Sequence, residues 1–253
     1  MNLAVTTEGF PESPTQDYNG NIQITCPSAI VIGDCEIPDH DREIFAMAVE
    51  MAHRLNIRTL IINGDFIEAD AFSKWPKISD TGQKFPVEID LARATIKEFL
   101  KYFNEIYVTS GNHERRLARG TSGAVWLNML MEGQPQMQIS EYAHMIMETP
   151  AGTWLICHPA NYSRIPLSTA RELAAIKQCH ILAAHNHHLS MGHDRSGKWW
   201  IVDGGCCRNP EKTGYKQMNI NTFPQWIPGF TIIKDGIPMI VSKKTFDVIS
   251  RMF

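Results

Sequence analysis

The sequence predicts an α/β fold in which mixed β-sheets are flanked by helices, and three features of its pattern support this. Short, continuous apolar runs rich in β-branched residues are typical of strands buried on both faces. These runs cover residues 29–34, 59–65, 106–112, 153–158, 181–185 and 199–205. Helical patterns separate several of the runs, which favours parallel strands covered by helices. Two segments that turn at residues 150–152 and 235–236 have the pattern of hairpins and add antiparallel strands.

Helices are expected in four places. Residues 41–55 and 87–103 carry apolar side chains at helical spacing, so each segment buries one face. A third helix is expected over residues 123–132. The capping-box spacing of Thr169 and Glu172 predicts a fourth, short helix.

Length and composition fit a single folded domain with a short lead-in. The chain has 253 residues, 43% of them hydrophobic, which is enough for one sizeable core. Residues 1–27 are polar and contain three prolines, so we expect an N-terminal arm followed by one domain over residues 28–253. None of the six cysteines forms a CxxC pair, which favours reduced thiols in the core over a disulfide framework or a zinc knot.

The charge and the N-terminus exclude several classes of protein. There are 24 Lys and Arg residues against 27 Asp and Glu residues, so the net charge of −3 does not predict nucleic-acid binding by the whole surface. The first residues lack the basic start and long apolar run of a secretory signal. No stretch is long and apolar enough to span a membrane, so the expected location is the cytoplasm, a host's cytoplasm if the chain is phage-encoded.

Side chains of metal-binding types follow the predicted strands, at the end where ligand sites gather in parallel α/β sheets. They are Asp34, Glu36, Asp65, Asn112, His113, His158, His185 and His187. Alternate residues of an extended segment point the same way, so Asp34 can share an ion with Glu36, and His185 can face one centre with His187. Glycines beside two of these positions let the backbone turn sharply and approach the ions. Carboxylate, amide and imidazole ligands together suit Mn, Fe, Zn or Ni.

The order of these blocks resembles the calcineurin-like metallophosphoesterases. That family has D-x-H, then G-D-x-x-D/N, then G-N-H-D/E, then a lone H, then G-H-x-H, and the match covers most of residues 29–205. The chain departs from the pattern at three positions. Glu36 stands where the family usually has His, Glu68 where it often has Asp, and Ala184 where it has Gly. The stretches GDCEIPDHD and GDFIEADAFSKWPK look most like the phage and prophage branch of the superfamily.

The resemblance implies a sandwich-like stack of sheets and a centre with two divalent metal ions. Manganese is the first choice, with Fe, Zn, Ni or Mg as alternatives, and a carboxylate at Glu36 should shift the preference towards Mn or Mg and away from Zn. One ion would bind Asp34, Glu36, Asp65 and His187, and the other Asp65, Asn112, His158 and His185. Glu68 is expected beside the site or at the surface rather than on a metal.

The expected activity is hydrolysis of phosphate esters by a metal-bound hydroxide. Asp65, Asn112 and His113 form the catalytic set, in which His113 protonates the leaving oxygen or stabilises the charge that develops on it, and Glu114 or a nearby carboxylate orients its ring. The first expectation is a phosphodiesterase acting on DNA, RNA or a nucleotide. The alternatives are a phosphomonoesterase or phosphoprotein phosphatase, and a binding scaffold of the same fold without catalysis.

Basic and aromatic residues near the predicted site are candidates for contacts with such a substrate. They are Arg115, Arg116, Trp75 and Arg164, and aromatic faces stack bases while arginines contact phosphates. The alternative is that Trp75 only packs its loop and the basic side chains are solvated. His188 and His193 are expected to be surface loop residues. The sequence leaves the natural substrate and the oligomeric state open.

Overall fold

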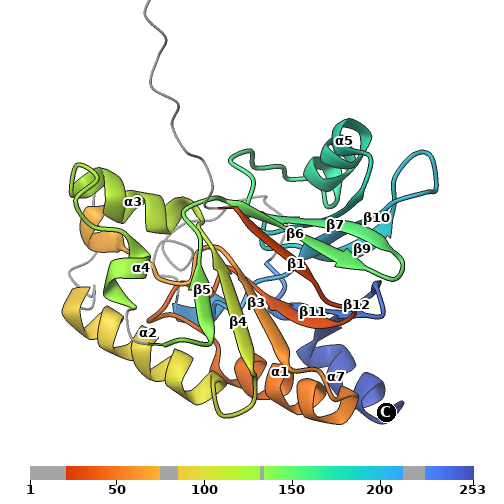
Figure 1. The fold of residues 1–253 in the computed structure, drawn as a ribbon, viewed down its shortest axis with the longest axis horizontal. Helices are drawn as coiled ribbons and strands as arrows, with labels where there is room; N and C mark the ends of the chain where they lie inside the picture. Colours follow the sequence, from red (N-terminus) through yellow and green to blue (C-terminus); the bar gives the residue numbers. More distant parts are fainter. Residues whose placement is uncertain (1–20, 75–84, 132–133, 213–225) are drawn as a thin grey trace, which may run out of the picture.

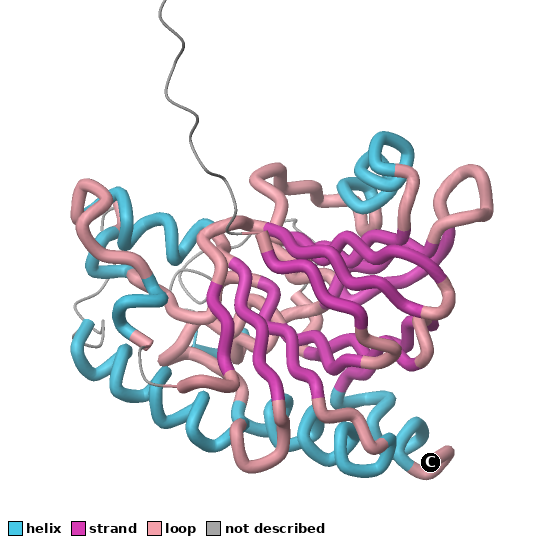
Figure 2. The backbone as a smooth tube through the Cα atoms, in the orientation of Figure 1, coloured by secondary structure: helices cyan, strands magenta, loops and turns pink. Residues whose placement is uncertain are grey.

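The computed structural model describes residues 21–74, 85–131, 134–212 and 226–253. Two six-stranded mixed sheets pack against each other, and helices cover their outer faces (Figure 1; Figure 2). The predicted α/β class with flanked, sandwich-like mixed sheets is therefore confirmed. Among the helices of the described residues, none has the length and hydropathy needed to cross a bilayer.

The first sheet has the strand order β1-β6-β7-β8-β10-β9. Its strands are β1 Ile22–Thr25, β6 His144–Thr149, β7 Gly152–Cys157, β8 His180–Ala183, β9 Leu189–His193 and β10 Trp200–Gly204. Strand β8 is parallel to both β7 and β10, whereas β6 and β7 form the predicted antiparallel hairpin at residues 150–151. The carboxyl ends of β7, β8 and β10 therefore lie at the same edge of this sheet.

The second sheet has the order β12-β11-β2-β3-β4-β5. Its strands are β2 Ala29–Ile32, β3 Thr59–Asn63, β4 Glu105–Thr109, β5 Met137–Ile139, β11 Gly229–Lys234 and β12 Ile237–Ser242. Strands β2 to β5 are parallel, and β11 and β12 form the second predicted hairpin. Asp235 and Gly236 both have positive φ at its tip, as a two-residue turn of this kind requires.

Helices cover the outer face of each sheet. Three of them, α1 Arg42–Leu55, α2 Phe85–Phe99 and α7 Lys243–Ser250, lie along the second sheet, and α5 Ser168–Lys177 lies on the first sheet (Figure 1). Two further helices, α3 Asn112–Gly120 and α4 Leu127–Leu130, follow β4, and two 3₁₀ turns span Asp70–Phe72 and Pro210–Lys212.

The alternation of side chains explains why the strand runs are apolar throughout. In β2, Ile30 and Ile32 belong to the core shared with α1 and α2, whereas Val31 belongs to the core between the two sheets. In β3, Leu60 belongs to the core shared with the helices and Ile61 to the core between the sheets. Both faces of these strands are covered, so every position favours an apolar residue.

Local structure differs from the expectation at two helices. Residues 123–131 of the third expected helix contain only the single turn α4, residue 132 lies outside the described residues, and the longer helix here is α3. Four residues of α3 are buried, but only Leu117 and Ala118 among them are apolar, so its sequence shows no clear apolar stripe. Helix α5 has no side-chain cap; it follows Leu167, whose backbone N–H donates to Asp203 Oδ2, and Thr169 lies inside it.

Part of the segment expected to be an arm belongs to a sheet. Ile22–Thr25 form β1 and pair in parallel with β6, and Ile22 is buried between the sheets. The strand is only four residues long and its apolar residues, Ile22 and Ile24, alternate with polar ones. Its partner lies more than a hundred residues further along the chain, so the pairing is not visible in the local sequence.

Candidate metal centre

The predicted ligands meet where the carboxyl ends of parallel strands from both sheets come together. Asp34 and Glu36 follow β2, Asp65 follows β3, and Asn112 begins α3 just after β4. These three strands belong to the second sheet. The histidines follow β7 and β8 of the first sheet, at positions His158, His185 and His187. The sheets are joined at this point, since the Asn63 side-chain amide donates to the Cys157 carbonyl at 2.8 Å.

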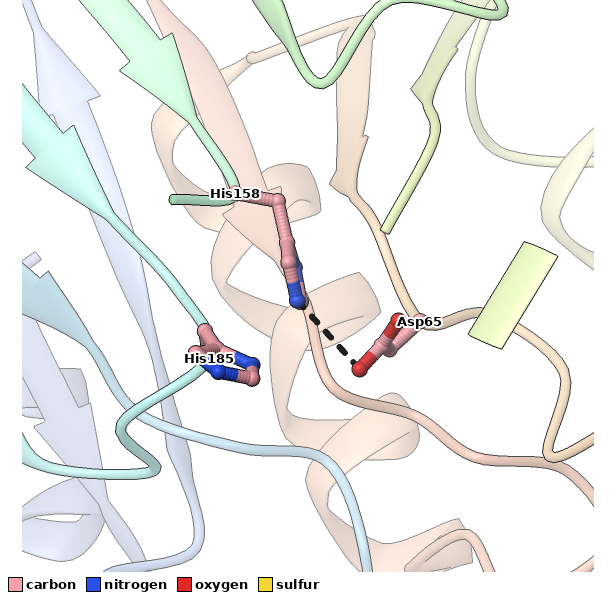
Figure 3. A group of neighbouring side chains, drawn as sticks. All are labelled: Asp65, His158 and His185. Atoms are coloured by element: carbon pink, nitrogen blue, oxygen red, sulfur yellow. Dashed lines mark ion pairs between the residues drawn. The ribbon is translucent and has the colours of Figure 1, made fainter. Parts of the chain in front are cut away.

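One group of potential ligands consists of Asp65, His158 and His185, whose donor atoms lie within 4.8 Å of one another. Figure 3 shows the three side chains pointing towards a common space from separate strand ends, with His158 Nε2 and Asp65 Oδ2 3.3 Å apart. Asn112 Oδ1 lies 3.2 Å from the same His158 Nε2. His158 Nδ1 lies 3.1 Å from the Asn63 carbonyl oxygen, which favours a proton on Nδ1 and leaves Nε2 free for a metal.

A second group consists of Asp34, Glu36 and His187. His187 Nε2 lies 3.3 Å from Asp34 Oδ1 and 3.1 Å from Glu36 Oε1. The two groups adjoin, because the backbone N–H of His185 donates to Asp34 Oδ2 at 2.9 Å. The structure therefore assigns His185 and His187 to different groups, not to one common centre.

His113 lies beside both groups and is buried. Its Nε2 is 3.6 Å from Asp65 Oδ2, its Nδ1 is 3.7 Å from Glu68 Oε2, and its backbone N–H donates to Asp65 Oδ1 at 2.8 Å. Glu114 does not orient this ring, contrary to the first of the two expected arrangements. Its carboxylate accepts the backbone N–H groups of Asp65 and Phe66 at 2.9 and 2.8 Å and so holds the loop after β3.

The convergence of the ligands depends on left-handed backbone, not on extended segments as expected. Five of the predicted ligands have positive φ: Asp34 at 47°, Glu36 at 47°, Asp65 at 49°, His185 at 77° and His187 at 58°. Residues other than glycine rarely adopt this region, and such strain is concentrated at active sites and ligand clamps. Strands β2, β3 and β8 are thus followed by left-handed residues that direct the polar side chains inwards.

Two glycines permit the close approach of these turns. Gly64 has φ +74°, and a Cβ there would lie 2.5 Å from His158 Nδ1. A Cβ on Gly111 would collide with the Asp65 carboxylate. The sequence-based reason for these glycines, sharp turns and close approach, matches this geometry.

We expect Gly64→Ala to damage the group around His158. The side chain would force a left-handed alanine, at a cost of about 1–2 kcal/mol, and would displace the His158 ring. The measurements are thermal unfolding and metal content, with Gly123→Ala as the control because Gly123 has a similar φ of +81° but open space around it. If both variants keep the metal content of the wild type, the close packing of Gly64 on His158 has no role in the site.

Burial and neighbouring charges have opposite effects on the pKa values of the site residues. Burial disfavours the charged form of His158, but the Asp65 and Asp34 carboxylates raise its pKa to about 9. Burial likewise disfavours a charged His187, yet Asp34 raises its pKa well above the usual value. The pKa of Asp34 is lowered although burial raises it, because His187 and His158 are close. The carboxylates are thus arranged to stabilise positive charge, which divalent ions supply more strongly than imidazolium groups.

The residues fit divalent metal ions. Each group combines carboxylate oxygen with imidazole nitrogen in a buried setting, and this donor set suits Mn, Fe, Zn or Ni. The nitrogen of His158 that faces the group is the one not used by the backbone. Asp65 lies in one group only, so its expected role as a bridge between two ions stays a prediction.

The structure places the four candidate substrate contacts in different surroundings. Arg116 Nη1 is engaged by Glu68, 3.4 Å from Oε1 and 3.2 Å from its carbonyl oxygen, so this arginine holds the loop. Arg164 is exposed on the loop after β7, and Trp75 lies outside the described residues. Arg115 lines a cleft of about 770 Å³ together with the site residues Asn112 and His158.

Sequence reasoning missed three residues near the site. Trp126 and Arg119 line the same cleft as Arg115. Arg208, which follows β10, is buried and pairs with Glu36, Asp39 and Glu68. Arg119 and Trp126 follow the predicted ligand Asn112 in the chain, so their position could have marked them as candidates for substrate contacts. The local sequence around Arg208 contains no such indication.

His188 is a buried residue, which corrects the expectation of a surface loop position. Only 2% of its surface is exposed, and its Nδ1 lies 3.5 Å from Asp203 Oδ2. The loop after β8 turns inwards at His187 and carries the next residue into the protein with it. His193 is exposed, as expected, but it belongs to strand β9 and not to a loop, and its ring packs on Trp200.

Comparisons with known proteins give structural likeness but no sequence match. No family model matches the chain, and neither does any curated protein sequence. Among solved structures, vacuolar protein sorting 29 from Cryptosporidium parvum is similar over 85% of this chain and 95% of its own, with 12% identity and a TM-score of 0.47. Vps29 from Entamoeba histolytica, solved with Zn²⁺, matches over 84% of this chain and 89% of its own, with 16% identity and a TM-score of 0.42. A predicted phosphoesterase from Streptococcus pneumoniae matches over 86% of this chain and 98% of its own, with 13% identity and a TM-score of 0.37.

Proposed function

We propose that this chain is a phosphoesterase that uses two divalent metal ions. The observation that carries the proposal is the pair of adjoining, buried carboxylate–imidazole groups described above. One group offers Asp65, His158 and His185, with Asn112 beside them, and the other offers Asp34, Glu36 and His187. Manganese heads the proposed metals, and the motifs around residues 33–41 and 64–77 support a phage-type relative of the calcineurin-like superfamily.

When bound, two such ions would neutralise charge on a phosphate and make water a better nucleophile near neutral pH. The chain's own residues would do the remaining work. Asp65 lies next to His158 and His113 and would hold the two sides of the centre together. Its left-handed turn is fixed by Glu114, which accepts three consecutive backbone N–H groups of the loop, those of Asp65, Phe66 and Ile67.

His113 would supply the proton for the leaving oxygen. Its ring is 6% exposed and lies at the border of the centre, with Nε2 towards Asp65 and Nδ1 towards Glu68. A positioned general acid typically contributes about 10²–10⁴-fold to the rate. Glu68, rather than Glu114, would hold the ring in place.

A phosphodiester in a nucleic acid or nucleotide is the substrate that the neighbouring cleft favours. The cleft of about 770 Å³ begins at Asn112 and His158 and continues past Arg115, Arg119 and Trp126. This volume suits a nucleotide-sized group. An aromatic face can stack a base, and arginines can contact a second phosphate.

The test of the proposed function is hydrolysis with and without metal. We expect the protein to bind two divalent ions per chain and to hydrolyse bis-p-nitrophenyl phosphate faster than p-nitrophenyl phosphate, with activity lost on chelation and restored by Mn²⁺. The opposite order of rates would identify a phosphomonoesterase. Bound metal without hydrolysis of any ester, including oligonucleotides and phosphopeptides, would identify a binding scaffold.

We expect Trp126→Ala to weaken binding of an oligonucleotide while leaving a small ester unaffected. Loss of base stacking is worth about 1–3 kcal/mol, so KM for a short oligonucleotide should rise by roughly 5- to 150-fold. Trp126→Phe should restore most of the loss, and added salt should weaken binding further. Lys177→Ala is the control, because Lys177 lines the neighbouring cleft and not this one. Equal KM values for the wild type and Trp126→Ala would remove the cleft from the proposal.

A further inference from the structure

A buried arginine contacts a residue of the proposed metal centre. Arg208 follows β10 and is 6% exposed. Its Nη1 contacts Glu36 Oε2 and lies 3.0 Å from Glu68 Oε2, and its Nη2 lies 3.0 Å from Asp39 Oδ2. Three carboxylates from the loops after β2 and β3 therefore surround one guanidinium.

The backbone on either side of Arg208 is fixed to the same loop that carries Glu36. Arg208 forms an antiparallel bridge with His40. The Cys207 N–H donates to the Gly33 carbonyl at 3.0 Å, and the Asn209 N–H donates to the Asp39 carbonyl at 2.8 Å. The guanidinium is thus held in one place by its main chain as well as by its ion pairs.

Arg208 lies within a third set of potential metal ligands. Glu36, Glu68 and His113 offer donor atoms within 4.8 Å of one another, as the two groups of the proposed centre do. Nη1 of Arg208 contacts one oxygen of each glutamate in this set. The guanidinium of Arg208 therefore already provides a positive charge between the two carboxylates of this set.

The two oxygens of Glu36 have different partners. Oε2 faces Arg208, while Oε1 lies 3.1 Å from His187 Nε2 in the group with Asp34. Only Oε1 is left for an ion in that group. Glu68 is occupied on both oxygens, with Arg116 at 3.4 Å from Oε1 and Arg208 at 3.0 Å from Oε2.

We propose that Arg208 is a built-in cation that closes the Glu36–Glu68–His113 set to metal ions and makes Glu36 a one-oxygen ligand for the neighbouring group. The inference rests on the proposed two-metal function and assigns Arg208 as a positioning residue. A carboxylate restricted to one oxygen resembles an imidazole in offering a single donor atom. Large ions such as Ca²⁺ accept bidentate carboxylates and six to eight ligands, so this restriction disfavours them relative to Mn²⁺ or Mg²⁺.

The experiment measures metal binding to the full chain after chelation, by calorimetry with Mn²⁺ and Ca²⁺ and by metal content after dialysis. The wild type should bind two Mn²⁺ ions. Arg208→Met should bind three, and its affinity for Ca²⁺ relative to Mn²⁺ should rise by about tenfold or more, because Glu36 and Glu68 become free to bind through both oxygens. Arg208→Lys should keep two ions, and Arg208→Met combined with Glu68→Gln should return to two.

An Arg208→Met variant that melts cooperatively but keeps the wild-type stoichiometry and Ca²⁺ to Mn²⁺ ratio would overturn the inference, since a merely structural ion pair would change only the melting temperature. If that variant does not fold, Glu68→Gln alone decides: two ions are expected because Glu68 is not a ligand, and loss of an ion overturns the inference. Failure of the wild type to bind metal would instead overturn the proposed function, and this inference with it.

Discussion

Replacing Asp65 with Asn is expected to reduce metal binding at both groups and to lower phosphoesterase turnover by about 10³-fold or more. Asp65 is the carboxylate of the group with His158 and His185, and its predicted role as a bridge between the two ions extends the effect to the other group. Metal ions stabilise the charge of a phosphoryl transition state by several kcal/mol, and each 1.36 kcal/mol corresponds to a factor of ten in rate. Metal content and the rate of diester hydrolysis are the two measurements.

Two other variants make this result specific. Asp34→Asn should damage mainly one group, since Asp34 lies with Glu36 and His187. Asp90→Asn is the matched control, because Asp90 is exposed on α2 and pairs only with Arg93 among the described contacts. Two metal ions per chain and full activity in both Asp65→Asn and Asp34→Asn would show that these two carboxylates do not hold the metal ions, which would overturn the proposed centre.

Replacing His113 with Ala is expected to lower turnover by about 10²–10⁴-fold while both metal ions remain bound, because the ring is proposed to give a proton and not to hold a metal. The loss should appear in kcat, and it should be smaller for an ester whose leaving group is already acidic. His113 is buried beside Asp65 and Glu68, so the folded state must be checked by its melting curve.

The control for His113 is His53→Ala, since His53 is exposed on α1 and belongs to none of the groups of potential ligands. Wild-type turnover in His113→Ala would remove the proposed acid. Loss of one bound metal ion in that variant would make His113 a ligand instead, and it would also contradict the proposal that Arg208 closes the set with Glu36 and Glu68 to metal ions.

Much of the fold was readable from the sequence because the features that specify it are local. Apolar runs with polar ends predicted six strands, and apolar residues at helical spacing predicted α1 and α2. The six strands are β2, β3, β4, β7, β8 and β10. The turn at Asp235–Gly236 was readable for the same reason, since it depends on two adjacent residues that tolerate positive φ. Strand β1 and helix α3 were missed because their stabilising contacts come from distant parts of the chain or from a few buried residues.

The identity of the candidate ligands was also determined by the sequence alone, since each follows a strand and all parallel strands of a sheet end at the same edge. Only the tertiary structure decided how their side chains are directed. The left-handed turns at Asp34, Glu36 and Asp65 set the direction of these side chains, and that of Asp65 is held by Glu114 of helix α3. Arg208 and Glu68 lie 140 residues apart in the chain, yet their ion pair decides which oxygens remain for a metal. Such pairing depends on where the strands lie in space, and no local pattern of residue types encodes it.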